Sequence, residues 1–331
     1  MRNSKITDNQ RRILALIRQH DGISRTDISK VLGLSLPSIS KHIERFIQVG
    51  HVFEDGFSLS SGGRRPIVLR YNYDYSISLN LIIEFKGVRA ILTNLSGEHL
   101  SEVSYEFEDT SKSFIIEKLN DVINDERFSV ADTVVVSIPG ILDGTVIKKS
   151  NLYPDLEGKD LRELLSIKKD IRVFAYNDVD CKVYGKYITE DSIYDSIYYI
   201  SYEKKGIGCG LIINSQIHQG AHYYAGELGY LETKDSVSVH DLLFNKESCD
   251  FEARVETLST MIMSVMFTLD PQIIYLAGNN EHMNKNLFEA IKQRLFKKVD
   301  LDFSIVHCEK NHEIQIKGML EFAMHQIEMQ L

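Results

Sequence analysis

Residues 62–66 read Gly-Gly-Arg-Arg-Pro, and this short stretch is the strongest local indication of the fold. The two glycines lack a Cβ, so the backbone can turn tightly there, and Arg64 and Arg65 place two guanidinium groups beside the turn. At the tip of a β-ribbon, such a turn can press on a phosphate backbone or enter a minor groove. On its own the stretch is equally consistent with an ordinary solvated turn, so the residues before it decide between the two interpretations.

Three helices are expected before this turn. Apolar residues recur at helical spacing from Asn9 until Asp21-Gly22, and Ser24 is a candidate N-cap for a short second helix. A third helix, roughly Leu36 to Val49, has Pro37 in its first turn. Helix, helix, Gly-containing turn, helix and hairpin is the order of a winged helix-turn-helix. One face of the third helix is apolar. The opposite face carries the side chains that we expect to reach base edges and phosphates: Ser38, Ser40, Lys41, His42 and Arg45.

The distribution of charge supports a DNA-binding N-terminal segment. Residues 1–70 hold 12 Lys or Arg and 6 Asp or Glu, a net charge of +6, whereas the whole chain has a net charge of −9. Residues 71–331 therefore carry −15. Such an asymmetry is expected when one domain meets a polyanion and the other does not. The alternative, a small basic helical domain that binds protein, is weakened by the predicted wing.

The whole chain has the features of a cytoplasmic protein of two or three domains. The N-terminal residues lead directly into a polar helix, so no secretory leader is expected, and no apolar run approaches the roughly 20 residues that span a bilayer. Four widely spaced cysteines form no Cys-x-x-Cys pair, which favours free thiols in a reducing compartment over a disulfide framework or a zinc site: Cys181, Cys209, Cys249 and Cys308.

Strand patterns alternate with helix patterns after residue 72, which predicts an α/β fold. The strands Ile77 to Phe85 and Val88 to Leu95 form a hairpin, so the sheet is expected to be mixed. Ligands in such folds bind beyond the carboxyl ends of strands, where Pro139-Gly140 and Asn177-Asp178 fall. Further strands are expected at 133–137, 171–175, 197–202, 210–213 and 273–277. Helices are expected at 113–123, after Asn177-Asp178 through Val183 and Tyr187, and at 251–269 and 313–329.

These residues together resemble the transcriptional regulators of the ROK family (repressors, open reading frames, sugar kinases). The resemblance extends over nearly the whole chain, and its specificity comes from the order and spacing of many short fragments. Besides the predicted wing at 62–66, they are Ile138-Pro139-Gly140, Ser150-Asn151-Leu152, Asn177-Asp178, Gly206-Ile207-Gly208-Cys209-Gly210, Gly220, Ala225-Gly226-Glu227-Leu228-Gly229, Asp270-Pro271 and Gly278.

The resemblance implies a winged helix-turn-helix domain at residues 1–72 and a sugar-sensor domain with the two-lobed actin-like ATPase fold at 73–331. The small lobe would comprise about 76–190 plus the C-terminal helix, and the large lobe about 191–312.

Phosphoryl transfer is not expected of this chain, although the family includes sugar kinases. In those kinases a turn of the form Asp-x-Gly-Gly-Thr cradles phosphate with backbone N–H groups. The corresponding positions here are Ile82, Glu84, Phe85 and Lys86, where a bulky ring and a carboxylate oppose phosphate. The second phosphate turn keeps Gly206, Gly208 and Gly210, but Lys204 and Lys205 replace its Gly-Thr. We therefore expect no enzyme activity and no cofactor.

The sugar-binding residues of the family have better counterparts. Asn177 and Asp178 match the pair that holds the sugar and supplies the general base in kinases of the family, and Glu227 matches a second carboxylate for sugar hydroxyls. Gly140 and Asn151 would contribute through backbone and side chain. A helix N-cap for Asn177-Asp178 and a surface turn for Glu227 are the alternatives.

A structural zinc ion is not expected. Many family members have a His that binds metal and sugar after the Glu227 motif, followed by a cysteine-rich loop. This chain has Tyr230 at the His position, and residues 231–242 contain no cysteine. His222 and His240 lack thiolate partners nearby in the sequence. Tyr230 would either donate its hydroxyl to the sugar or fill the space.

The favoured hypothesis is a sugar-responsive repressor of carbohydrate-utilisation genes that binds double-stranded operator DNA as a homodimer or homotetramer. Its effector would be a small sugar or sugar derivative that the chain binds without phosphorylating it. Two alternatives remain at this stage. The chain could be a sugar kinase with an appended DNA-binding domain, or it could sense a phosphorylated sugar through Lys204, Lys205 or Lys86.

Overall fold

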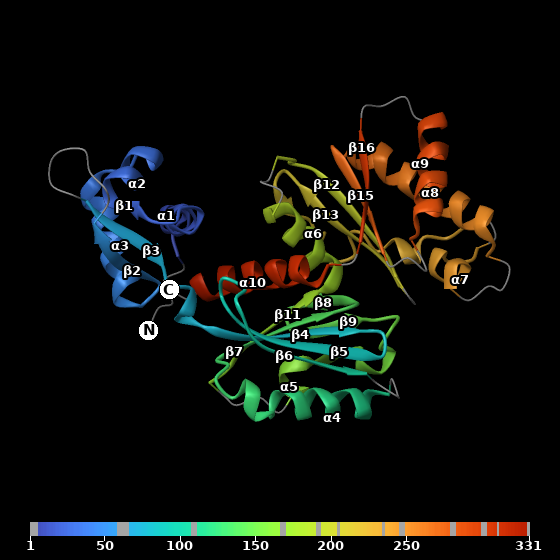
Figure 1. The fold of residues 1–331 in the computed structure, drawn as a ribbon. Coiled ribbons are helices and arrows are strands. Elements are labelled where there is room, and N and C mark those ends of the chain that lie inside the picture. The colour runs from blue at the N-terminus through green and yellow to red at the C-terminus, as the bar shows by residue number, and fades with distance from the viewer. Residues whose placement is uncertain are drawn as a thin grey trace.

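The computed structural model describes residues 6–57, 66–106, 111–165, 170–189, 193–203, 206–233, 236–244, 249–278, 283–298, 303–309 and 311–329. A small N-terminal domain stands beside two larger lobes, each built around a five-stranded sheet (Figure 1). The mixed α/β fold agrees with the sequence prediction. No helix in the described ranges combines the length and the apolar character needed to cross a membrane.

The N-terminal domain is a winged helix-turn-helix. Helices α1 (Asp8–Gln19), α2 (Arg25–Leu32) and α3 (Leu36–Gln48) pack on a three-stranded sheet of order β1-β3-β2, formed by β1 (Ile23–Ser24), β2 (Val52–Phe57) and β3 (Ile67–Tyr71). The predicted boundaries rest on visible caps, since the Ser24 hydroxyl accepts from the Asp27 amide and Gly33 ends α2 in the left-handed region. The predicted turn at 62–65, with Arg64 and Arg65, lies outside the described residues.

The small lobe has a mixed sheet of order β11-β7-β4-β5-β6. Its strands are β4 (Ile77–Glu84), β5 (Gly87–Asn94), β6 (His99–Glu106), β7 (Thr133–Ile138) and β11 (Arg172–Asn177). Strands β4, β7 and β11 are parallel, whereas β4, β5 and β6 form an antiparallel meander. Helix α4 (Lys112–Ile123) packs on one face of the sheet and α10 (His312–Glu328) on the other (Figure 1).

A smaller sheet of order β10-β9-β8 joins the small lobe. It contains β8 (Ile141–Asp143), β9 (Val146–Lys149) and β10 (Lys159–Asp160), and the short helix α5 (Leu161–Leu164) follows it. The short 3₁₀ turns η1 (Tyr73–Tyr75), η2 (Glu126–Phe128) and η3 (Pro154–Leu156) link elements of this half of the chain. The sequence reading did not predict β6, β8, β9 or β10.

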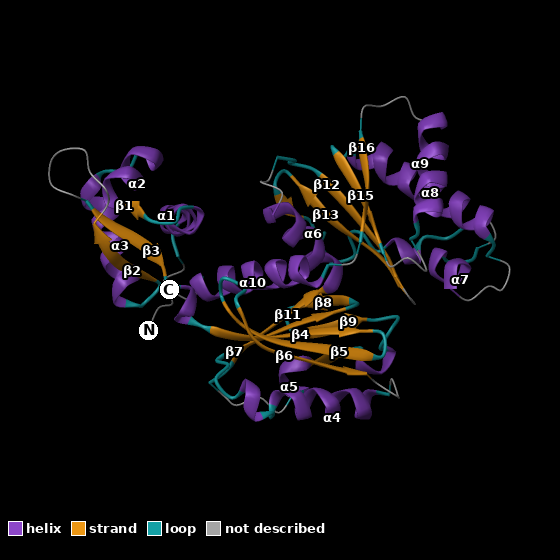
Figure 2. Ribbon diagram, in the orientation of Figure 1, coloured by secondary structure: helices purple, strands orange, loops and turns teal. Residues whose placement is uncertain are grey.

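The large lobe has a second mixed sheet, of order β14-β13-β12-β15-β16. Its strands are β12 (Ile197–Glu203), β13 (Gly206–Ile213), β14 (Gln216–Ile217), β15 (Ile273–Ala277) and β16 (Ser304–Cys308). Helices α7 (Val239–Phe244), α8 (Phe251–Leu269) and α9 (Lys285–Lys298), with η4 (Leu228–Tyr230), lie on one side of it (Figure 2). Helix α6 (Asp178–Thr189) packs on the other side through Val179 and Val183.

Three glycines of the large lobe lie within a strand and not in a turn, which corrects the sequence interpretation. Gly206, Gly208 and Gly210 all belong to β13. A Cβ at Gly208 would come within 3.0 Å of Val179, and one at Gly210 within 2.5 Å of Val183. At these two positions glycine lets α6 approach the sheet closely, a packing role that sequence spacing alone does not distinguish from phosphate binding.

The two lobes meet where α6 and α10 cross between the sheets (Figure 1). A Cβ on Gly185 of α6 would lie 1.8 Å from the backbone oxygen of Ile314, and one on Gly318 of α10 would lie 2.0 Å from that of Cys181. Backbone therefore packs directly on backbone at this crossing. The crossing fixes how the helix on one sheet sits against the helix on the other.

The far end of α10 is part of the winged-helix core. Met324 and Ile327 of α10 pack with α1, α3 and β3 in one buried cluster. The Arg18 guanidinium of α1 lies 2.9 Å from a Glu321 oxygen, and the Tyr71 hydroxyl donates to Glu328 at 3.1 Å. Burial opposes the charge on Arg18, yet Glu321 and Glu328 outweigh it and the guanidinium pKa is raised. A single helix thus joins the small-lobe sheet to the winged-helix domain.

The helix crossing predicts a large cost for a methyl group at Gly318. We expect Gly318→Ala to lower the free energy of unfolding by about 1–3 kcal/mol, because a packed backbone must shift to admit it. The matched control is Gly206→Ala, where the added Cβ would meet nothing within 4 Å. Urea unfolding of both variants measures the difference, and equal midpoints would contradict a close backbone contact.

Candidate functional site

The predicted DNA-reading residues lie on α3, on the side away from the winged-helix core. Ile39, Ile43 and Phe46 are fully buried beneath the helix. The residues predicted to meet DNA remain at least partly accessible, Lys41 being exposed and Ser38, Ser40, His42 and Arg45 half-buried. The pKa of His42 is lowered by its partial burial and by the positive charges of Lys41 and Arg45. The imidazole is therefore neutral near neutral pH. The helix therefore offers hydroxyl, imidazole and cationic groups along one accessible face.

Acidic side chains of the wing are paired within the domain. Arg25 lies 2.7 Å from Glu54, and Arg70 lies 2.5 Å from Asp55. These pairs neutralise two acidic side chains of β2. Arg25 and Arg70 are therefore paired within the domain, although the sequence count includes both of them in the net charge of +6.

A cleft between the two lobes collects the predicted sugar-binding residues. The small lobe contributes β4 and its turn, the segment after β7 and the end of β11. The other wall is formed by the first turns of α6, by the strands β12 and β13, and by the loop around Glu227. All six predicted residues line it: Gly140, Asn151, Asn177, Asp178, Glu227 and Tyr230. His240 and Gln315, which were not assigned to the sugar site, line the cleft as well. The sequence analysis missed Gln315 because it lies on α10, which is far in sequence from the other residues that line the cleft.

Gly140 has a conformation that requires glycine. Its φ is +142°, and a Cβ there would lie 2.6 Å from the backbone oxygen of Lys149. Its carbonyl accepts a 2.8 Å hydrogen bond from the Asn177 side-chain amide. The backbone of Gly140 thereby ties the end of β7 to the end of β11 at the cleft.

Asn177 also organises the start of α6. Its side-chain oxygen accepts hydrogen bonds from the backbone N–H groups of Val179, at 2.8 Å, and Asp180, at 3.0 Å. This is the helix-cap role weighed as the alternative in the sequence analysis. The cap uses the side-chain oxygen, and one N–H of the amide still remains for a ligand.

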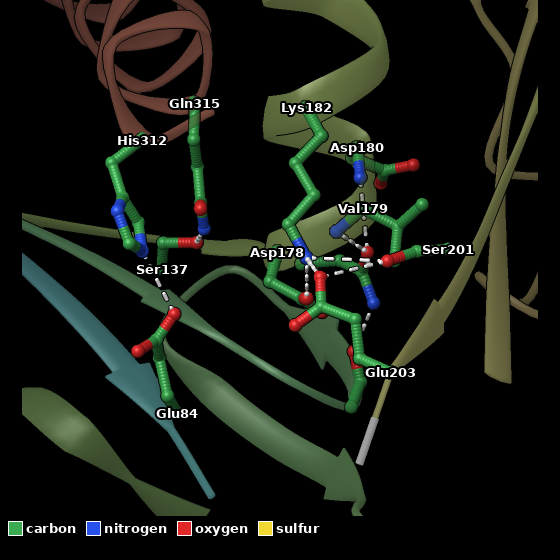
Figure 3. A network of polar contacts seen from close by, with 12 residues as sticks. Glu84, Ser137, Asp178, Val179, Asp180, Lys182, Ser201, Glu203, His312 and Gln315 are labelled. Atoms are coloured by element: carbon green, nitrogen blue, oxygen red, sulfur yellow. Dashed lines mark hydrogen bonds and ion pairs between the residues drawn. The ribbon is translucent and has the colours of Figure 1, made fainter. Parts of the chain in front are cut away.

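Asp178 begins α6 and is held by a lysine that the sequence analysis did not single out. The Lys182 ammonium lies 2.8 Å from Asp178, 2.9 Å from Glu203 and 3.4 Å from the Ser201 hydroxyl (Figure 3). Burial disfavours the charged lysine, but the two carboxylates prevail, and the Lys182 pKa is well above its usual value. The spacing of four residues between Asp178 and Lys182 is a helical ion-pair signal that could have revealed the contact.

Glu227 is a half-buried carboxylate whose pKa is raised. Burial raises its pKa to about 7, and the negative charges of Asp178 and Asp180 add to the shift. Asp180, fully buried, accepts a 2.7 Å hydrogen bond from Gln219, and its pKa is about 6, raised chiefly by burial. Glu227 can thus donate or accept a hydrogen bond near neutral pH, which suits a sugar hydroxyl.

Tyr230 and Asn151 contact each other on one wall of the cleft. The Tyr230 hydroxyl donates to the Asn151 side-chain oxygen at 2.8 Å, and the Lys149 ammonium sits 4.4 Å from the centre of the Tyr230 ring. The tyrosine therefore both fills space and orients an amide. No group of three or more His, Cys, Asp or Glu within the described ranges is placed to hold a metal ion.

The turn between β4 and β5 is a two-residue hairpin formed by Phe85 and Lys86. Glu84 pairs with Gly87 across it, and Lys86 has φ +58°. The Glu84 carboxylate lies 3.0 Å from His312 Nε2 at the start of α10 (Figure 3). The hydroxyl of Tyr153 donates to the Glu84 backbone carbonyl. The turn thus presents a ring and a carboxylate to the cleft.

Comparisons with known proteins agree with this architecture. Residues 86–250 match the sequence profile of the ROK family, and residues 6–50 match that of winged helix-turn-helix DNA-binding domains. The xylose repressor of Bacillus subtilis is 29% identical over 236 residues, which cover 67% of this chain and 60% of the repressor. That of Staphylococcus xylosus is 27% identical over 291 residues, covering 84% of this chain and 74% of the repressor. The matched part thus spans about 60% of the length of the first of these relatives.

Solved structures show the same fold at low sequence identity. A ROK family transcriptional regulator, described as a homologue of the E. coli MLC protein, superposes with a TM-score of 0.76 at 18% identity, covering 97% of this chain and 98% of the regulator. A ROK family glucokinase from Streptomyces griseus, in complex with glucose and AMPPNP, gives a TM-score of 0.58 at 12% identity, covering 75% of this chain and 99% of the kinase. The part of this chain that superposes on the kinase, 75% of its length, is comparable in size to the two lobes together.

The Glu227 carboxyl predicts that the free energy of unfolding falls as pH rises. The pKa of Glu227 is about 7 in the folded chain and lower in the unfolded chain, so the folded chain binds more protons between these two pKa values. The stability that this proton contributes is lost as the pH rises to about 7. We expect Glu227→Gln to stabilise the chain by about 2 kcal/mol near pH 8 and to change little near pH 5. Urea unfolding at both pH values tests this, with exposed Glu232→Gln as the control. Asp180 leaves a residual slope, and an equal effect of Glu227→Gln at both pH values would contradict the assignment.

Proposed function

We propose that this chain, which joins a winged helix-turn-helix domain to a ROK family domain, is a sugar-responsive DNA-binding transcriptional repressor. The observation that carries the proposal is the position of α10. His312 and Gln315, near its start, lie at the interlobe cleft, whereas Met324, Ile327 and Glu328, near its end, lie in the winged-helix core. A ligand in the cleft and DNA on α3 therefore act on opposite ends of one helix.

The DNA-binding part of the proposal rests on α3 and the charge of the N-terminal segment. Helix α3 would enter a major groove, with Ser38, Ser40, Lys41, His42 and Arg45 toward bases and phosphates. Arg64 and Arg65 remain predicted contacts of the wing from the sequence. In a homodimer or homotetramer, two such helices would meet successive major grooves about 34 Å apart on a palindromic operator. The xylose repressors and the regulator NagC of E. coli among the relatives support this role.

The sugar-binding part rests on the polar groups that converge in the cleft. Asp178 and Glu227 supply carboxylates, Asn151 and Asn177 supply amides, and Tyr230 supplies a hydroxyl and a ring face. A cavity with several hydrogen-bond acceptors and an aromatic wall suits a polyhydroxylated ligand. The division into a winged helix-turn-helix at 1–72 and a sensor at 73–331 is part of this proposal.

The coupling would run through the helix crossing. A sugar that contacts both lobes favours one angle between them, and the crossing of α6 and α10, whose backbones touch at Gly185 and Gly318, would be the pivot about which that angle changes. To shift the equilibrium, the sugar needs a differential affinity for the two arrangements on the order of a few kcal/mol. Arg18 and Tyr71 would transmit the movement of α10 to α1 and β3 through Glu321 and Glu328.

We infer that the chain binds the sugar without phosphorylating it. Phe85 and Glu84 stand where a phosphate turn would need small residues and backbone N–H groups. The alternative is a sugar kinase with an appended DNA-binding domain. A radioactive ATP transfer assay on a hexose panel separates them, because transfer that disappears in Asp178→Asn would establish the kinase.

The repressor proposal is tested with the full chain. A melting screen over hexoses, pentoses and amino sugars identifies a stabilising sugar by mass action. Selection from random duplexes identifies a bound DNA sequence, whose dissociation constant is then measured with and without that sugar. We expect specific binding and a sugar-dependent change of roughly five- to 150-fold. Failure to select any duplex, or an affinity that the sugar leaves unchanged, would contradict the proposal.

A variant of α3 tests the DNA-reading face. We expect Lys41→Ala to weaken binding of the selected duplex about tenfold and, if it contacts a phosphate, to reduce the salt slope by about one. Lys30 is the matched control, because it is exposed on α2 and lies 3.6 Å from Asp27. Equal affinities of Lys41→Ala and Lys30→Ala would remove α3 from the interface.

A further inference from the structure

Lys182 is a buried cation in the wall of the cleft. Its side chain is 8% exposed, and it extends from the second turn of α6 toward the strand β12 (Figure 3). Its three partners, Asp178, Ser201 and Glu203, all line the same cleft. A lysine that served packing alone would not require partners drawn entirely from the ligand-binding wall.

The ammonium has no donor left for an anionic ligand. An ammonium carries three N–H donors. These are matched by Asp178 at 2.8 Å, Glu203 at 2.9 Å and the Ser201 hydroxyl at 3.4 Å. The Ser201 hydroxyl in turn donates to Glu203 at 3.1 Å, which closes the network. A phosphate entering the cleft would have to displace a carboxylate to reach Lys182.

Among the described residues, the remaining charges of the cleft also disfavour an anion; Lys204 and Lys205, between β12 and β13, lie outside those residues. Four carboxylates line it, and among the described residues two ammonium groups do so, those of Lys149 and Lys182. Lys149 stands over the Tyr230 ring, and Glu84 faces the cleft from the β4 hairpin. A phosphorylated sugar would meet negative charge on several sides, whereas hydroxyl groups can donate to the same carboxylates.

The lysine also fixes the carboxylates for such a ligand. Asp178 and Glu203 each have an oxygen within 3 Å of one nitrogen, so Lys182 holds α6 to β12 at the cleft and compensates two charges that would otherwise repel each other. With Lys182 absent, the same wall would be more negative and would favour a cation.

We infer that Lys182 is a positioning residue that sets the charge class of the effector, directing Asp178 and Glu203 toward an uncharged, polyhydroxylated sugar. This inference rests on the proposed sugar-sensing function and deepens it. It assigns the sugar to the unphosphorylated, non-amino class and explains why a buried ion pair stands in the ligand-binding wall.

The test uses the full chain and three matched series of probes, built on glucose, galactose and mannose. Each series contains the free hexose, its 2-amino derivative and its 6-phosphate, and calorimetry gives the dissociation constants in mildly acidic buffer. We expect the wild-type chain to bind a free hexose at least about tenfold more tightly than its charged counterparts. This comparison needs no variant, so it stands even where a substitution impairs folding.

Two variants then test the residue itself. We expect Lys182→Met to lose about tenfold or more in affinity for the free hexose and to turn its preference toward the cationic 2-amino sugar, while Lys182→Arg retains the wild-type preference. A general loss of packing would weaken all probes alike and would not be rescued by arginine. Preferential binding of a 6-phosphate by the wild-type chain, or an unchanged preference in Lys182→Met, overturns the inference and leaves the sugar-sensing proposal standing. Binding of none of the probes overturns the inference, whereas the sugar-sensing proposal is decided separately by the melting screen over hexoses, pentoses and amino sugars.

Discussion

The arrangement of the molecule depends on one close contact, the packing of α6 backbone on α10 backbone at Gly185 and Gly318. A Cβ on either glycine would overlap a backbone carbonyl of the other helix, so neither position has room for a side chain. Because α6 lies on the large-lobe sheet and α10 on the small-lobe sheet, this contact joins the two lobes. The same α10 ends in the winged-helix core. A change in the angle between the lobes therefore has a direct physical route to the DNA-binding domain.

The residues of the cleft support the receptor role that we propose for it. A phosphoryl-transfer site needs backbone donors and cations arranged around phosphate, and a carboxylate available to the attacking hydroxyl. Here the hairpin after β4 lines the cleft with a carboxylate and an aromatic ring, those of Glu84 and Phe85. The polar groups that remain can accept hydrogen bonds from a sugar and hold it, so the energy of binding can be used to favour one arrangement of the lobes.

Sequence reasoning captured the elements with strong local signals. Ser24, Gly33 and Pro37 mark the ends of helices through local chemistry, and the predicted helices α1 to α4, α8 and α10 are present. It misplaced Gly206, Gly208 and Gly210, because a glycine that admits a helix looks the same in sequence as one that admits phosphate. It missed α9 and the edge strands β6 and β16. The six predicted sugar residues share one cleft. Lys182 had a local signal in its four-residue spacing from Asp178, but Glu203 and Gln315 reach the cleft through contacts between elements far apart in the sequence, which no local pattern displays.

The central claim is that occupancy of the cleft is felt in the winged-helix core through α10. Hydrogen–deuterium exchange of the full chain, with and without a saturating sugar from the melting screen, measures this directly, because amide protection reports local opening along each helix. The account predicts altered exchange in residues 312–329 and in α1, as well as around 139–151 and 177–182. Changes confined to the cleft segments, with α1 and the second half of α10 unaffected at saturation, would contradict it.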